Sequence, residues 1–305
     1  MATQKKGKDH ALQTLYPHLL ETVSIQDIQI PMRDGHVNDL KVYKPTDLKP
    51  SESLPVFFSN HGGGFVVGNT ETEDLINRQL THECRLVIFS LDYRLSPEHP
   101  TIPTIFNDAE DGLKWVYEHA PEYDGDMTKG LLTGGTSVGG LMASMLAFRS
   151  AKLGIPVTGT LMRQGAVMMP FVAKEEWKPR LKSMEENADA PLFNTKIAVD
   201  MYKLMTFPEG SLTDPWNFPV FASEEELARH PPIFITGAGC DPIIDDLYLF
   251  KDLLEKAGVP VQLKVHEGVP HGFHGFHMLK AAKEEMQDTP AGVKWLLGFS
   301  RGAVA

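Results

Sequence analysis

The chain has 305 residues, of which 42% are hydrophobic and 23% charged, and its formal net charge at pH 7 is −11. This composition is typical of a globular protein with a sizeable core, and it argues against global disorder. The negative net charge, with no basic stripe to offset it, argues against nucleic-acid binding.

The N-terminal region predicts neither a signal peptide nor a membrane anchor. Three lysines lie within residues 5–8, but polar residues and a proline interrupt residues 9–20, which follow. No apolar run of about 18 residues or more occurs in the sequence. The two cysteines, Cys84 and Cys240, are too few for a disulfide framework, although one bond between them stays open. These features favour a cytoplasmic protein without a membrane span.

From about residue 22, β-rich apolar stretches alternate with helix-like stretches. Strands are expected at 23–30, 39–45, 54–60, 85–93, 130–135, 165–170, 231–239 and 261–268. Helices are expected at 70–83, 102–119, 138–152, 242–257 and 277–287. Several of the strands are apolar on both faces, which indicates a mostly parallel sheet flanked by helices on both sides. The predicted fold class is therefore α/β.

Two regions interrupt this alternation. Residues 1–21 are expected to be helical, and residues 171–222 are too long for a loop and contain two helical patches. We interpret both regions as a helical cap over a catalytic domain formed by residues 22–170 and 223–305. The alternative is an ordinary extra helical layer.

A serine among glycines directly precedes the helix expected at 138–152. Residues 133–142 read TGGTSVGGLM. Their glycine spacing does not fit the dinucleotide fingerprint, and a P-loop needs a lysine where Gly140 stands. They do match G-x-S-x-G, in which Ser137 lies on a tight strand-to-helix turn with small residues two positions away on each side. Such a turn exposes the hydroxyl at the carboxyl edge of the sheet, and the next helix directs its N–H groups there. Ser137 is therefore the candidate nucleophile.

A nucleophilic serine of this kind needs an acid and then a base, each after a later strand. Asp241 is the first acid after the seventh predicted strand, whereas Asp245 lies about a turn into the next helix, where helix-start and surface acids are common. His271 is the first histidine in the loop after the last strand. It also opens an H-x-x-H-x-x-H run with His274 and His277, so a metal site is the less favoured alternative.

A glycine-rich loop after an early strand supplies the candidate oxyanion hole. Residues 60–69 read NHGGGFVVGN and match the HGGG-type motif. The N–H groups of Gly63 and Gly64 are expected to face an oxyanion, with the N–H of Val138 as a third donor. His61 is expected to bond within the loop rather than to react.

Together these motifs resemble the hormone-sensitive-lipase-like carboxylesterases of the α/β-hydrolase fold. The stretches that carry the resemblance are HGGGF, DYRLSPEHP, GTSVGG, DPIIDD and PHGF, in the family's order between about residues 55 and 280. The resemblance implies hydrolysis of carboxylic esters with short or medium acyl chains, without cofactor or metal, and homodimers formed through the edge of the sheet. It carries the catalytic triad to Ser137, Asp241 and His271. One departure is Thr136, where many members have aspartate, although a threonine-bearing branch exists.

The substrate pocket is expected to be apolar and shaped by the cap. Candidate lining residues are Phe193, Met201, Met205 and Trp216, although such residues at helical spacing often pack in a core. The sequence does not separate ester hydrolysis from acyl transfer to another acceptor, or from cleavage of a thioester or lactone in a biosynthetic pathway. A non-catalytic small-molecule receptor is the more remote alternative, because the candidate base is present.

Overall fold

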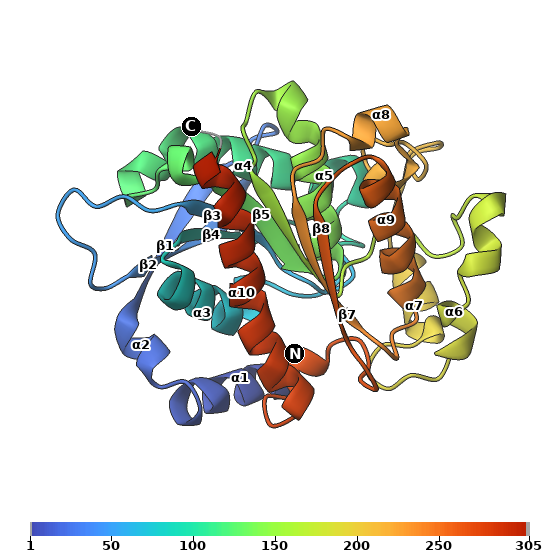
Figure 1. The fold of residues 1–305 in the computed structure, drawn as a ribbon, viewed down its shortest axis with the longest axis horizontal. Coiled ribbons are helices and arrows are strands. Elements are labelled where there is room, and N and C mark those ends of the chain that lie inside the picture. Colours follow the sequence, from blue (N-terminus) through green and yellow to red (C-terminus); the bar gives the residue numbers. More distant parts are fainter. Residues whose placement is uncertain (1, 303–305) are drawn as a thin grey trace.

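The central sheet has eight strands in the order β1-β2-β4-β3-β5-β6-β7-β8 within residues 2–302, which the computed structural model describes (Figure 1). Neighbours from β4 and β3 through to β8 are parallel, whereas β1 pairs with β2, and β2 with β4, in antiparallel fashion. The strands are β1 (Val23–Pro31), β2 (Val37–Pro45), β3 (Val56–Asn60), β4 (Val87–Leu91), β5 (Leu131–Thr136), β6 (Gly159–Arg163), β7 (Ile233–Ala238) and β8 (Val261–His266). The predicted α/β-hydrolase fold with a mostly parallel sheet is confirmed.

Burial along the strands explains their sequence patterns. Every residue of β3, β4, β5, β6 and β7 is buried, so these strands read as continuous runs of apolar and small residues. In β8, at the end of the sheet, more exposed positions alternate with less exposed ones. A strand with helices on both faces has no solvent-facing side, and this is why the central strands lack alternation.

Helices cover both faces of the sheet and divide the core into two large clusters. On one face, α3 (Asp74–Cys84) and α10 (Lys280–Gly302) pack against each other and share a cluster that includes Leu80 and Leu296 (Figure 1). On the other face, a larger cluster includes residues of α4, α5 and α9, such as Leu113, Leu141 and Leu247. These helices are α4 (Phe106–His119), α5 (Val138–Leu153) and α9 (Ile244–Lys256).

One predicted strand was placed wrongly. Residues 165–170 are not a strand; β6 precedes them, and they form a loop between β6 and the inserted segment. The run is apolar because Ala166, Met168 and Met169 line a cavity, as described below, and not because it lies in the sheet. The last helix also differs, since α10 runs well beyond the predicted end at residue 287.

The inserted segment 171–222 contains only short helices. They are η5 (Glu175–Arg180), α6 (Ser183–Glu186), α7 (Thr195–Tyr202) and η6 (Pro219–Phe221), and α8 (Glu224–Leu227) follows them. At the N-terminus lie α1 (Ala2–Thr14) and α2 (His18–Thr22). Residues of α1 and α7 border the same cavity. A cap formed by 1–21 and 171–222 remains a prediction; residue 1 of the cap and residues 303–305 of the catalytic domain lie outside the described residues.

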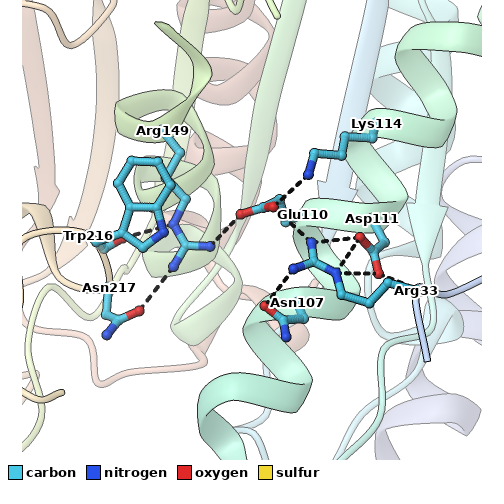
Figure 2. Close-up of polar contacts among 8 residues, drawn as sticks. All are labelled: Arg33, Asn107, Glu110, Asp111, Lys114, Arg149, Trp216 and Asn217. Atoms are coloured by element: carbon cyan, nitrogen blue, oxygen red, sulfur yellow. Dashed lines mark hydrogen bonds and ion pairs between the residues drawn. The ribbon is translucent and has the colours of Figure 1, made fainter. Parts of the chain in front are cut away.

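A buried arginine on α5 ties the end of this segment to the body of the protein (Figure 2). Arg149 Nη1 lies 2.8 Å from Glu110 Oε2 on α4, and its Nη2 donates to Asn217 Oδ1 at 3.0 Å. Its Nε donates to the carbonyl oxygen of Trp216 at 2.9 Å, and the guanidinium lies over the Trp216 ring. Glu110 also accepts from Arg33, in the turn after β1. These contacts fix where the segment rejoins the sheet.

Two further expectations concern a membrane span and a disulfide. Among the described residues, no helix is both long and apolar enough to cross a membrane. Cys84 and Cys240 are free thiols, so the disulfide that the sequence left open is not formed.

Candidate active site

Ser137 lies at the junction of β5 and α5 in a strained conformation. Its φ of 57° and ψ of −122° fall in a region that non-glycine residues rarely adopt. A Cβ at Gly135 would lie 2.2 Å from the carbonyl oxygen of Asn60, and one at Gly139 would lie 2.1 Å from it. Only glycine therefore fits on either side of the serine. This is the tight strand-to-helix turn that the G-x-S-x-G pattern predicts.

The structure brings the three predicted triad residues together. His271 Nε2 lies 3.1 Å from Ser137 Oγ, and His271 Nδ1 lies 2.6 Å from Asp241 Oδ2. Because a carboxylate can only accept, Nδ1 carries the proton and Nε2 is left as the acceptor for the hydroxyl. Asp241 is fully buried, and its Oδ1 accepts from the N–H of Ile243 at 3.0 Å. Asp245, the alternative acid, instead accepts from backbone N–H groups of the inserted segment.

The other histidines of the H-x-x-H-x-x-H run have different neighbours. His274 Nδ1 lies 2.9 Å from Gln164 Nε2, and His277 is partly buried with no hydrogen bond to Nδ1. Burial, together with the positive charge of Arg163, lowers the pKa of His274 to about 3. Across residues 2–302, no group of three or more histidine, cysteine, aspartate or glutamate side chains is arranged to hold a metal ion.

The loop after β3 presents backbone N–H groups beside the serine. Gly63 has φ 124° and Gly64 has φ 62°, and a Cβ at Gly63 would lie 1.8 Å from the carbonyl oxygen of Val67. Within the described chain, neither glycine N–H is a donor in a hydrogen bond. Val138 is the first residue of α5, so its N–H has no partner in a preceding turn. These three residues and Ser137 line one cavity.

His61 supports this loop from within. Burial lowers its pKa to about 4, its Nδ1 lies 2.8 Å from the carbonyl oxygen of Gly62, and its ring stacks on Tyr93. The Tyr93 hydroxyl donates to the His61 carbonyl oxygen at 2.7 Å. A neutral, fully enclosed imidazole with these contacts holds the loop and does not reach the cavity.

The cavity in front of Ser137 has a volume of about 540 Å³. Of the predicted lining residues, Phe193, Met201 and Met205 border it, and the Phe193 ring centroid lies 4.6 Å from that of His271. Further apolar lining comes from Val138, Ala166, Met168, Met169, Ala198 and Ile243. The prediction for Trp216 was wrong: its ring lies against Arg149 and Lys152 of α5 and does not line the cavity.

Comparison with known proteins agrees with this geometry. The Abhydrolase_3 family, described as an alpha/beta hydrolase fold, matches residues 57–275 of the chain. The chain belongs to this alpha/beta hydrolase family. The resemblance to hormone-sensitive-lipase-like carboxylesterases, predicted from the motifs, is thereby confirmed, and the protein is a hydrolase.

Two relatives and one solved structure illustrate what this hydrolase is similar to. It is 31% identical to esterase LipI of Mycobacterium tuberculosis over 90% of its own length and 81% of the relative's. It is 27% identical to versiconal hemiacetal acetate esterase of Dothistroma septosporum, over 97% and 88% of the two chains. Among solved structures, vibralactone cyclase is similar with a TM-score of 0.88 and 30% identity, covering 96% of this chain and 86% of that one.

The hydrolase also has a buried ionic network at the cavity that Ser137 lines, which the sequence did not reveal. Arg163, at the end of β6, lies 3.1 Å from Glu73 Oε2 and 3.0 Å from Glu285 Oε2. The Thr136 hydroxyl donates to Glu73 Oε2 at 2.9 Å. Thr136 thus joins the network at the position where many relatives are expected to carry aspartate.

The two carboxyls of this network differ in their ionisation. Burial is the largest influence on Glu285 and opposes its ionisation, but the charge of Arg163, the neighbouring His274 and the hydrogen bonds from Arg163 and Thr236 together outweigh it and hold the pKa of Glu285 at about 2. Burial raises the pKa of Glu73, and Arg163 and Thr136 offset this only in part. A polar residue at the end of a buried strand would have been the signal for this network. That strand was predicted at 165–170 instead of Gly159–Arg163, so Arg163 was not seen as its last residue.

Proposed function

We propose that this hydrolase cleaves carboxylic esters through an acyl-enzyme on Ser137, with His271 as base and Asp241 as the acid that orients it. The observation that supports the proposal most strongly is the hydrogen-bonded series Ser137–His271–Asp241, with 3.1 Å and 2.6 Å between donor and acceptor atoms. Alignment of this kind is what a weakly nucleophilic hydroxyl needs for activation.

In the first half-reaction, Ser137 Oγ attacks the ester carbonyl carbon while His271 Nε2 removes the hydroxyl proton. The carbonyl oxygen becomes an oxyanion, which accepts hydrogen bonds from the N–H groups of Gly63, Gly64 and Val138. Each such donor contributes about 3 kcal/mol where single donors have been removed from oxyanion holes. When the tetrahedral intermediate collapses, the C–O bond to the alcohol breaks and His271 donates its proton to the leaving oxygen.

In the second half-reaction, water attacks the acyl-enzyme. His271 takes a proton from the water, the oxyanion forms again in the same hole, and Ser137 leaves with the proton returned to it. Asp241 accepts the Nδ1–H bond throughout and stabilises the imidazolium. The net change is one ester plus one water to one acid plus one alcohol.

We propose short- to medium-chain acyl groups as the preferred substrates. The cavity of about 540 Å³ is of the size that takes small ligands, and its apolar lining suits an alkyl chain. The relative named as an acetate esterase supports a short acyl group.

A panel of p-nitrophenyl esters from acetate to laurate tests the proposal. We expect turnover on the shorter esters and a fall in kcat/KM as the chain outgrows the cavity. Ser137→Ala should lower kcat by several orders of magnitude, as nucleophile removal does in other serine hydrolases. No turnover on any ester, or an unchanged rate in Ser137→Ala, would refute the proposal.

One observation favours a second candidate function on the same triad. The similar solved structure named vibralactone cyclase supports lactone chemistry as this second candidate, in which a hydroxyl of the substrate, rather than water, takes the acyl group. Transfer to another alcohol, amine or thiol would use the same acyl-enzyme. Product analysis of hydroxy-acyl esters, with and without an added acceptor, separates these outcomes: free acid indicates hydrolysis, and a lactone or a transfer product indicates the alternative.

A further inference from the structure

Gln164 is an unusual residue for its position. It follows β6 directly, its side chain is fully buried, and its φ of 45° places a non-glycine residue in the left-handed region. Such a conformation is strained and persists where the surroundings enforce it. Here the Gln164 N–H donates to the carbonyl oxygen of Thr236 at 2.7 Å. A strained, buried amide beside an active site suggests a role in that site.

The backbone around Gln164 is attached to the turn that holds the nucleophile. The carbonyl oxygen of Arg163 accepts from the N–H of Ser137 at 2.8 Å. The N–H of Ala166 donates to the carbonyl oxygen of Ser137 at 3.2 Å. Residues on both sides of Gln164 therefore bond to the serine's own backbone, and Gln164 is held at a fixed place relative to it.

The side chain of Gln164 reaches from there to the histidine loop. Its Oε1 accepts from the N–H of Gly272 at 2.7 Å, and its Nε2 lies 2.9 Å from His274 Nδ1 and 3.4 Å from Glu285 Oε1. Because a backbone N–H can only donate, Oε1 must face Gly272, and this fixes the orientation of the whole amide. His274 Nδ1 is then an acceptor, which agrees with the lowered pKa of that imidazole.

Gly272 is the residue after His271, so its N–H belongs to the peptide group that His271 begins. Gly272 itself has φ 80°, and no atom lies within 4 Å of where its Cβ would be. The space on the Cβ side of Gly272 is therefore open, and the N–H of this peptide is held by its hydrogen bond to Gln164. Asp241 holds the imidazole end of His271 and the Gly272 bond holds its backbone end, so the 3.1 Å approach of Nε2 to the serine depends on both.

We propose that Gln164 is a positioning residue for His271: it accepts the Gly272 N–H and thereby aligns the candidate base with the serine hydroxyl. This inference rests on the proposed function and adds a residue to its machinery. Gln164 does not touch the substrate or the reacting atoms, so its loss should reduce kcat more than it changes KM.

Two substitutions at Gln164 separate alignment from simple packing. Gln164→Met has a similar length but no acceptor for the Gly272 N–H. Gln164→Glu keeps a carbonyl-type oxygen there in either protonation state. Asn217→Leu is a matched control, because Asn217 is also a buried amide, bonded by Arg149, but does not line the cavity in front of Ser137. Each variant is compared with the wild-type enzyme on its best p-nitrophenyl ester.

The rates are normalised to the number of active sites titrated to completion with a fluorophosphonate. We expect Gln164→Met to lose about 10–100-fold in kcat, by analogy with the loss of hydrogen-bond partners that orient metal-binding histidines, with KM within about threefold. Gln164→Glu should recover to within about fivefold of wild type. Asn217→Leu should keep kcat within about twofold while its melting temperature falls.

Two results would overturn the proposal. One is a Gln164→Met kcat equal to that of Asn217→Leu, and the other is a Gln164→Glu as slow as Gln164→Met. If Gln164→Met does not fold, Gln164→Glu carries the test alone, and a loss beyond about tenfold in it contradicts the proposal. Failure of the wild type to hydrolyse any ester would refute the proposed function instead, before any variant is compared.

Discussion

Two buried arginines hold this hydrolase together in different ways. The side chains of Arg163 and Arg149 are each 3% exposed, and each links segments that are far apart in the sequence. Arg163 borders the cavity and joins Thr136, the residue before Ser137, to the start of α3 and to α10. Arg149 lies on the α5 helix and joins α4 to the end of the inserted segment, as Figure 2 shows. Similar burial of the same side chain can therefore serve either the alignment of a site or the attachment of a segment.

Their partners differ as well. Arg163 is the cation shared by Glu73 and Glu285, whose side chains are 3% and 0% exposed. Glu110, the partner of Arg149, also pairs with Arg33 and Lys114, which are both partly exposed. Removal of a partner is expensive when it leaves a buried charge alone and less so when other partners remain. The network of Arg163 should therefore lose more stability than the network of Arg149 when one of its charged partners is removed.

Arg163→Met is expected to have the largest effect. It leaves two buried carboxyls without their shared cation, and breaking a buried pair costs about 3–5 kcal/mol of unfolding free energy. Because Thr136 lies within the same network, kcat per titrated site should also fall by at least about tenfold. Urea unfolding and ester kinetics measure the two effects. A loss of stability with an unchanged kcat would remove the distinction between the two arginines.

Arg149→Met should destabilise the protein less and leave the chemistry alone. Glu110 keeps two other cations, so we expect a loss of about 1.5–3 kcal/mol, the range for hydrogen bonds to charged groups. The kcat per titrated site should stay within about twofold of wild type, because no residue of this network lines the cavity. The same pair of measurements applies, and a tenfold fall in kcat would show that the attachment of the segment governs catalysis.

The smallest effect is expected in the acid dependence of stability of Glu110→Gln, which is measured apart from the overall loss of stability caused by removing the carboxylate that pairs with Arg149. Burial opposes ionisation of Glu110, but Lys114, Arg33 and Arg149 hold its pKa at about 2. A depressed pKa contributes stability above the unfolded value near 4.5, and this is lost as pH falls towards 2. Glu110→Gln should therefore show a smaller drop in melting temperature between pH 5 and pH 3 than the wild type. Parallel curves for the two proteins would contradict this.

The sequence predicted those parts of the site that local chemistry dictates. G-x-S-x-G requires a tight turn, and the structure leaves room only for glycine at positions 135 and 139, two residues from Ser137 on each side. Asp241 is the first acid after β7 and His271 is the first histidine after β8, and the sheet brings the two loops to one edge. Their catalytic roles remain predictions, but their convergence in the fold is what the motifs indicated.

The features that the sequence missed depend on contacts between distant segments. The apolar run at 165–170 resembles a strand, and only the folded chain shows that it lines a cavity. Because the strand was predicted at 165–170 and not at Gly159–Arg163, Arg163 and Gln164 were not recognised as residues at the carboxyl end of a strand. Trp216 was misplaced for a similar reason: an aromatic residue in the inserted segment can face either substrate or a neighbouring arginine, and its local sequence does not distinguish them.

The most direct test of the central claim is the site of covalent labelling by a fluorophosphonate. Intact mass and peptide mapping should find one phosphonyl adduct per chain, on Ser137, with no adduct in Ser137→Ala and much slower labelling in His271→Ala. No adduct on the wild-type protein, or an adduct on another residue that persists in Ser137→Ala, would contradict the assignment of Ser137 as the nucleophile.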